Sequence, residues 1–204
     1  MPIVRLTDLF GLGCTQGNLD FVNVDVNGDT PLFIDPQALK YLRVDWAKLC
    51  VEDIQNFFSL LMTQISKGDS KRALEMLSGL REPNETHLGL STADARGRTL
   101  GPESANDLLK ALLKSKAARS GVLTDLEDTA LMIDGIGPDI ISDITTNIIR
   151  SYLIAYTQEM SRRYNIPVEE GIDSGPLWNS DEGIWESEFT SLPMGPKGKI
   201  LLVP

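Results

Sequence analysis

Residues 45–67 read DWAKLCVEDIQNFFSLLMTQISK and predict a long amphipathic helix. Asp45 is a suitable N-cap, and Lys67-Gly68 ends the pattern. The apolar positions recur every three or four residues and so share one helical face. They are Trp46, Cys50, Ile54, Phe57, Phe58, Leu61 and Ile65. This segment is the clearest core helix of the chain, and a folded core is expected.

The length and composition fit one large domain or two small ones. The chain has 204 residues, of which 42% are hydrophobic and 24% are charged, so wholesale disorder is excluded. No apolar run approaches the ~18 residues of a membrane span, and no basic segment precedes an apolar one at the N-terminus. We expect a cytoplasmic protein without contact with a membrane.

Four further helices are predicted from the same spacing. The last of them opens at Gly137-Pro138 and is the longest, and its core face carries Ile141, Ile144 and Ile148. Its first half is rich in β-branched residues, so a strand through 140–149 is the alternative. The predicted helices span about 70–80, 102–117, 124–133 and 137–164.

Strands are expected at both ends of the chain. Residues 19–26 alternate, residues 32–34 resume the apolar run, and Asn27-Gly28 lies between them, which predicts a β-hairpin that ends at Asp35-Pro36. Residues 165–204 lack clear periodicity and read as an irregular arm, whose final segment 199–204 looks like a strand. This strand either joins the hairpin or pairs with chain beyond residue 204.

The predicted fold class is therefore α+β and mostly helical. It has an N-terminal β-hairpin, about five helices and an irregular C-terminal arm that ends in a strand. Residues 1–164 are expected to form a single globular domain. Residues 165–204, acidic and containing proline, glycine and tryptophan, are expected to pack on it as the arm.

The charge distribution narrows the partners. The chain has 29 acidic and 19 basic residues, a net charge of −10, which opposes whole-surface attraction to a phosphate backbone. Residues 67–119 nevertheless hold ten bases and seven acids, a local charge of +3. Residues 120–149 hold six acids and neither Lys nor Arg. These acids must be solvated, cap helices or hold a cation.

Cysteine and histidine are too few for several site types. Two cysteines far apart exclude a disulfide framework and suit a reducing compartment. His87 is the only histidine, so metal sites with two imidazoles and mechanisms with two histidines are excluded.

One candidate site is an anion-binding loop over residues 89–101. Glycines let backbone N–H groups approach an anion, the helix at Pro102 adds partial positive charge, and two arginines suit bidentate phosphate binding. The alternative is a flexible surface loop without a ligand. The residues assigned to the anion site are Arg96, Gly97, Arg98 and Gly101.

A second candidate site is a cluster of carboxylates. Asp139 and Asp143 are one helical turn apart, and Asp134 precedes them across a Gly/Pro turn. Three such carboxylates would bind Mg²⁺ or Mn²⁺, which prefer oxygen ligands. The alternative is that they complement the positive end of the helix dipole.

Five segments, in chain order, carry a resemblance to known sequences: residues 33–36, 85–91, 125–128, 135–143 and 199–204. They resemble a loose group of uncharacterised bacterial proteins associated with phage defence and mobile elements. The larger members of this group look like restriction-type proteins in which this region precedes a nuclease-like part. The resemblance therefore implies a recognition or regulatory half, and it assigns no catalytic residue.

Two functions remain open. The first is a non-catalytic recognition or regulatory module of a phage–bacterium conflict system, which binds a nucleic acid or a partner protein through the 84–101 loop and the polar stripe of the last helix. This stripe consists of Asp139, Asp143, Asn147 and Arg150, which recur at helical spacing. The second is a metal-dependent phosphodiesterase or nuclease that uses Asp134, Asp139 and Asp143 with Arg96 and Arg98. Whether the chain forms a homo-oligomer is left open.

Overall fold

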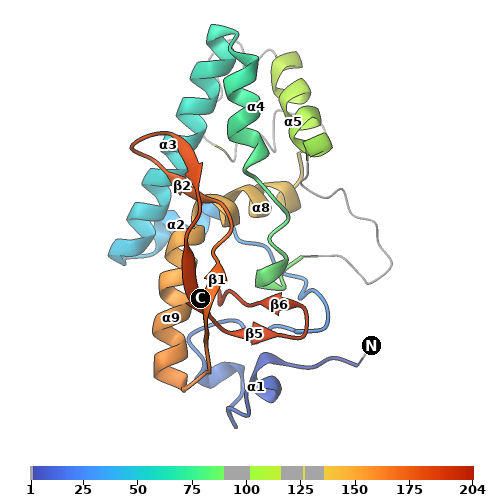
Figure 1. Cartoon of the computed structure of the whole chain (residues 1–204), viewed down its shortest axis with the longest axis vertical. Coiled ribbons are helices and arrows are strands. Elements are labelled where there is room, and N and C mark those ends of the chain that lie inside the picture. Colours follow the sequence, from blue (N-terminus) through green and yellow to red (C-terminus); the bar gives the residue numbers. More distant parts are fainter. Residues whose placement is uncertain (1, 90–101, 116–125, 127–135) are drawn as a thin grey trace.

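Helix α3, residues Asp45–Lys67, confirms the long amphipathic helix and packs against three other helices, α2 (Pro36–Tyr41), α4 (Ser70–Ser78) and α8 (Pro138–Ile148) (Figure 1). The structure is a computed structural model that describes residues 2–89, 102–115, 126 and 136–204. α3 ends at Gly68, whose φ of 75° suits a residue without a Cβ. Its N-cap is Val44, so Asp45 lies in the first turn instead, where its charge complements the helix dipole.

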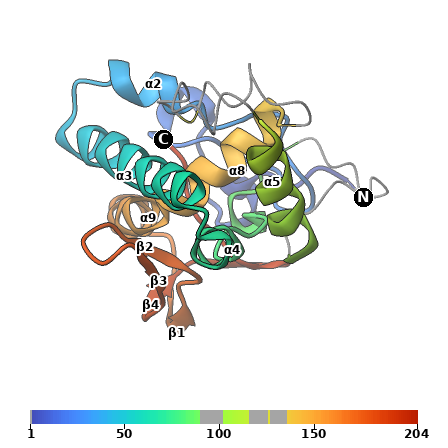
Figure 2. The ribbon, with the colours of Figure 1, turned by 90° about the horizontal axis from the view of Figure 1, so that it is seen from above.

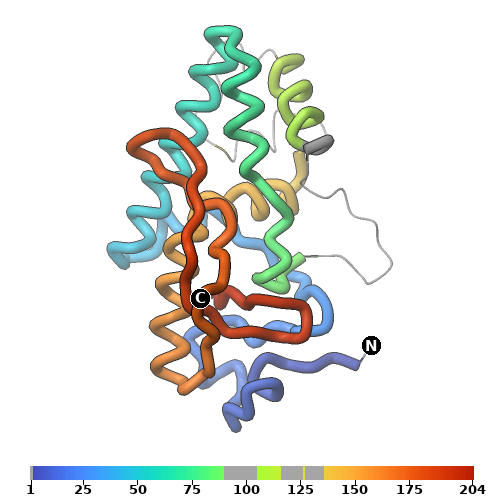
Figure 3. The backbone as a smooth tube through the Cα atoms, in the orientation of Figure 1, coloured from blue at the N-terminus to red at the C-terminus, as the bar shows by residue number. Residues whose placement is uncertain are grey.

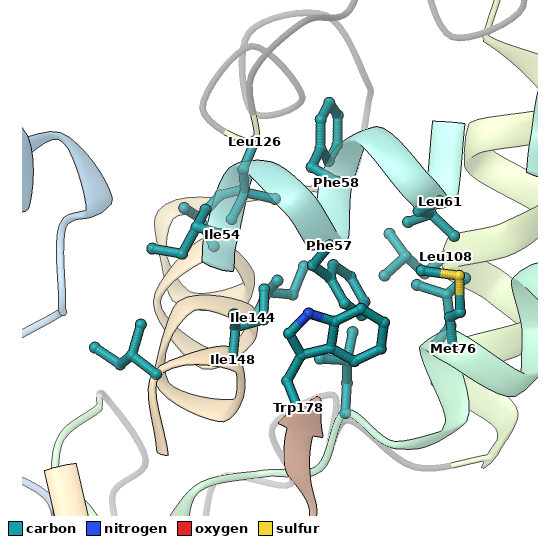
Figure 4. Packing of buried hydrophobic residues seen from close by; sticks show 14 of the residues in the cluster. Ile54, Phe57, Phe58, Leu61, Met76, Leu108, Leu126, Ile144, Ile148 and Trp178 are labelled. Atoms are coloured by element: carbon teal, nitrogen blue, oxygen red, sulfur yellow. The ribbon is translucent and has the colours of Figure 1, made fainter. Parts of the chain in front are cut away.

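The larger hydrophobic core forms where α3 meets α4, α5 (Pro102–Lys114) and α8 (Figure 4). α4 is capped by the Asp69 side chain, which accepts a hydrogen bond from the backbone N–H of Arg72 at 3.0 Å. The predicted helix over 124–133 lies outside the described residues apart from Leu126, which packs in this core. Residues that form the core include Ile54, Phe57, Phe58, Leu61, Met76, Leu108, Ile144, Ile148 and Trp178.

The predicted long helix over 137–164 is two helices. α8 ends at Ile148 and α9 spans Arg150–Tyr164, because Ile149, with ψ at 12°, leaves the helical region. The break allows the Arg150 side chain to reach back to Asn147, to which it donates at 3.1 Å. The alternative of a strand through 140–149 is wrong.

The predicted N-terminal β-hairpin is wrong, since the first strand of the described chain begins at Glu169. Asn27-Gly28 does form a turn, but its two arms pair with different segments. On one side the backbone N–H of Val26 donates to the carbonyl of Val4, and on the other the N–H of Thr30 donates to the carbonyl of His87. The backbone hydrogen bonds of each arm are thus made with another part of the chain, and no strand ladder forms between the two arms.

The C-terminal arm is not irregular but contains three antiparallel strand pairs. Across β2 and β3, Trp178 faces Trp185, and their indole N–H groups donate to Asn56 of α3 and to the Met76 carbonyl of α4. The arm therefore holds α3 and α4 together. The pairs are β1 (Glu169–Asp173) with β4 (Phe189–Leu192), β2 (Leu177–Asn179) with β3 (Ile184–Glu186), and β5 (Met194–Gly195) with β6 (Gly198–Lys199).

Residues 200–204, expected to form the final strand, are extended but join no strand ladder. Their alternating side chains enter two cores: Leu201 packs in the larger one, and Ile200 and Leu202 in a smaller one. The smaller core also contains Leu6 of α1 (Leu6–Leu9) and the apolar side chains of residues 21–26. The backbone of this segment is hydrogen-bonded to Pro193, Glu85, Thr157 and Val22, so it joins separate parts of the chain, whose course the tube in Figure 3 traces.

Candidate functional site

Two acidic residues of the predicted metal site lie at the start of α8. Gly137 is the N-cap, Pro138 occupies the first turn, and Asp139 and Asp143 follow one turn apart. A Cβ on Gly137 would lie 2.7 Å from Asp139 Oδ1, so the carboxylate of Asp139 lies close to the backbone of the N-cap residue. Asp139 is exposed, whereas Asp143 is partly buried.

Asp143 faces carboxylates from two further segments. Burial, together with the negative charges of Glu82, Asp139 and Asp29, raises the pKa of Asp143 to about 7. Burial and the charge of Asp29 also raise the pKa of Glu82. Within the described chain, no ion pair joins Glu82, Asp139 or Asp143 to a Lys or Arg. We call Asp29, Glu82, Asp139 and Asp143 the carboxylate group.

Asp29 and Glu82 were not predicted to belong to this site. Asp29 follows the Asn27-Gly28 turn and Glu82 precedes Pro83, so both lie where the sequence indicates a change in chain direction. No periodicity links either one to α8, so their proximity comes from tertiary structure alone. Asp134, the third predicted metal ligand, lies outside the described residues. Among the residues that are described, no three histidine, cysteine or acidic side chains gather closely enough to hold a metal ion.

The chain segment 81–89 is fixed against α8 by Asn147. The buried Asn147 side-chain N–H groups donate to the carbonyls of Arg81 at 2.6 Å and Asp143 at 2.8 Å, and its oxygen accepts from the Arg81 N–H at 3.3 Å. Arg150, also buried, forms an ion pair with Glu85. These contacts position Glu82 beside the start of α8.

The predicted polar stripe of the last helix is therefore only half available to a ligand. Asp139 and Asp143 lie toward solvent, but Asn147 and Arg150 are 0% and 2% exposed. Asp139, Asp143 and Asn147 follow one another along α8 at helical spacing, whereas Arg150 belongs to α9. The sequence spacing did not show that residues 81–87 cover the second half of the stripe.

His87 has a structural position beside the carboxylate group. Its backbone is left-handed, with φ at 52°, and its ring Nδ1 lies 3.3 Å from the Gly28 carbonyl. Burial lowers the pKa of His87, which keeps the imidazole neutral. The ring thus holds the turn at residues 25–30, from which Asp29 projects.

The predicted anion-binding residues, Arg96, Gly97, Arg98 and Gly101, lie outside the described residues. Gly89, the first residue of the predicted loop, lies beside the carboxylate group. A Cβ added to Gly89 would lie 3.5 Å from Asp29 Oδ2.

Exposed apolar side chains gather around α2. The described chain has nine exposed large hydrophobic residues, and six of them fall within residues 32–49. We call these six the apolar surface: Leu32, Phe33, Tyr41, Leu42, Val44 and Leu49. α2 itself is capped by Asp35, which accepts from the Gln37 N–H at 2.8 Å, and buries Leu39 against α3.

A cavity of about 240 Å³ opens within this surface. Its lining is almost wholly apolar and joins α2 and α3 to the end of the chain and to Leu88. Figure 2 shows α2 on the side of the molecule opposite the strands β1 and β4. The residues that line the cavity include Leu32, Phe33, Leu39, Leu42, Trp46, Leu88, Val203 and Pro204.

The fold and site define an α+β domain whose carboxylate group and apolar surface are joined by residues 29–35. Residues 11–204 match the family described as "Domain of unknown function (DUF8370)", and the chain belongs to this family. Neither a curated protein nor a solved structure matches the chain. None of the helices in the described ranges has the length and apolarity needed to cross a bilayer.

Proposed function

We propose that this domain is a non-catalytic recognition module that binds a partner protein through the apolar surface. The observation that carries the proposal is the concentration of exposed apolar side chains on one short segment. Tyr41 is 81% exposed, and Leu42, Val44 and Leu49 are each exposed by more than 40%. Exposed apolar side chains concentrated in one segment are typical of protein interaction sites, because their contact with water is unfavourable.

A partner protein is favoured over a nucleic acid in this proposal. The net charge of −10 opposes phosphate binding, and the acidic start of α8 adds to that repulsion. Arg150, the cation of the polar stripe, is buried in its pair with Glu85 and so cannot reach a phosphate.

The proposal also includes the biological system and the cellular location in which the domain acts. The sequence resemblance favours a phage–bacterium conflict system, with this domain as its recognition or regulatory part. A cytoplasmic location is supported by Cys14 and Cys50, which are both free thiols.

A photo-crosslinking amino acid at Leu42 tests the proposal in the source cells. Leu42 is 44% exposed, so the change leaves the core intact. We expect one specific protein adduct at this position. The matched control is the same amino acid at Phe189, which is 80% exposed on β4 and should give no adduct. No adduct at Leu42, the same adduct at both positions, or a cross-linked dimer of this chain would contradict the proposal.

A metal-dependent phosphodiesterase or nuclease is a second candidate, favoured by the electrostatic influence of Asp29, Glu82 and Asp139 on the carboxyl group of Asp143. Carboxylates with raised pKa values are frequent at catalytic sites. In this candidate, Asp139 and Asp143 bind Mg²⁺ or Mn²⁺ with Asp134, and Arg96 and Arg98 contact phosphate.

Incubation with plasmid, single-stranded DNA and RNA separates the two candidates. Chelator-sensitive cleavage in Mn²⁺ that is lost in Asp143→Ala would favour the enzyme. Cleavage by neither protein, together with calorimetry that shows no Mn²⁺ binding, would favour the recognition module.

A further inference from the structure

We infer that the partner segment carries one large apolar side chain, which enters the cavity beside α2, and a lysine or arginine on one side of it, which contacts the carboxylate group. This inference rests on the proposed recognition function and adds the chemistry of the partner.

The cavity suits a side chain rather than a separate small molecule. Its volume of about 240 Å³ lies below the ~300 to 1,000 Å³ of ordinary small-molecule pockets. Apart from Asp35 its lining is apolar, and it includes the exposed side chains of Leu32, Phe33 and Leu42 and the buried side chain of Leu39. Anchoring of a helix or extended peptide by one large apolar side chain is a common form of recognition.

The carboxylate group borders the same chain segment. The backbone N–H of Ile34, which lines the cavity, donates to Ser142 Oγ at 2.9 Å, and Ser142 directly precedes Asp143. On the other side Leu88 lines the cavity, and the next residue, Gly89, lies against Asp29. Two independent connections therefore place Asp143 and Asp29 near segments that line the cavity.

Charge complementarity determines which partner fits. Glu82, Asp139 and Asp143 form no ion pair within the described ranges, and their mutual repulsion raises the cost of ionising Asp143. A lysine or arginine placed there would relieve this repulsion. Arg43, which follows Leu42 in the sequence, is exposed and basic. The partner's positive charge is thus expected on the side toward α8.

Selection from a random peptide library tests the inference. Displayed peptides of roughly twelve residues are selected on the full chain, after depletion on the Leu42→Asp protein to remove peptides that bind elsewhere. We expect enriched sequences with one large apolar residue and Lys or Arg on a single side of it. The affinity of a selected peptide should fall about tenfold on Leu42→Ala and on Asp139→Asn with Asp143→Asn. The Phe189→Ala protein should bind it unchanged.

The outcomes separate the inference from the proposed function. Peptides that depend on Leu42 but lack basic residues would overturn the inference while the recognition module stands. A library without enrichment, with a specific Leu42 cross-link in cells, would also overturn only the inference. Failure of both experiments would overturn both. A peptide that needs Mn²⁺ to bind would assign the carboxylates to a metal and contradict the inference.

Discussion

The backbone N–H of Ile34 donates a hydrogen bond to the buried Ser142 hydroxyl at 2.9 Å, although the two residues are 108 positions apart. This bond connects the segment before α2 to the acidic half of α8. Ile34 lines the apolar cavity, and Ser142 precedes the partly buried Asp143. This one hydrogen bond therefore connects the wall of the apolar cavity to the helix that carries Asp143.

The stability of the protein should depend on the ionisation of Asp143. Its pKa is about 7 in the fold, compared with ~3.9 in an unfolded chain, so its contribution is present below about pH 4 and is lost as the pH rises through 7. As the pH rises through this window, the free energy of unfolding of Asp143→Asn should increase relative to that of the wild type. The expected increase is about 2 kcal/mol after allowance for the partial exposure of Asp143. Urea unfolding at several pH values measures the difference. The exposed Asp181→Asn is the control, and parallel pH profiles for wild type and Asp143→Asn would refute the assignment.

The buried pair of Arg150 and Glu85 should behave as a coupled unit. Arg150→Met leaves Glu85 without its partner and should destabilise the fold by about 3 kcal/mol or more. Adding Glu85→Gln removes the stranded charge, so the double variant should be more stable than Arg150→Met alone. Chemical denaturation of the four proteins gives the coupling free energy. Simple additivity of the two losses would show that the pair is not coupled.

Gly79 should not tolerate a side chain. A Cβ there would lie 2.2 Å from Trp185 Cδ1, although the backbone, with φ at −77°, is otherwise suited to alanine. We expect Gly79→Ala to cost about 1 to 3 kcal/mol through overpacking and to change the tryptophan fluorescence. Gly17→Ala is the matched control, because a Cβ at Gly17 meets nothing within 4 Å. Equal stability of the two variants would contradict the packing of Trp185 on α4.

The two cysteines should differ in reactivity. Cys50 is 0% exposed, and burial together with Asp53 raises its pKa to about 12, so little thiolate forms at neutral pH. A thiol reagent should label Cys14 in the native protein and both cysteines in denaturant. Rapid labelling of native Cys14→Ser protein would mean that α3 opens or that Cys50 is not in the core.

Local sequence patterns predicted the helices because apolar periodicity is a property of neighbouring residues. Residues 45–67 carry their cap, their apolar face and the stopping glycine within one segment. The break at Ile149 was missed because the apolar spacing continues across it, and no local signal marks the change in the Ile149 backbone.

The predictions of the hairpin and of the carboxylate group failed for the same reason, because both features depend on contacts between segments far apart in the sequence. Asn27-Gly28 specifies a turn, but pairing of the flanking arms was decided by Val4 and His87 elsewhere in the chain. Asp139 and Asp143 could be grouped from their spacing, whereas Asp29 and Glu82 join them only through tertiary packing. The apolar surface was also missed, since Leu32 and Phe33 were assigned to an arm of the predicted hairpin, whereas both are exposed.

The most direct test is the affinity of the cross-linked partner for two variants, each of which replaces one exposed apolar residue by alanine. Leu42 and Phe189 are both exposed, but only Leu42 lines the cavity. Leu42→Ala should weaken binding about tenfold, and Phe189→Ala should leave it unchanged. Equal affinities for both variants, or a loss only with Phe189→Ala, would show that the surface around α2 is not the partner site.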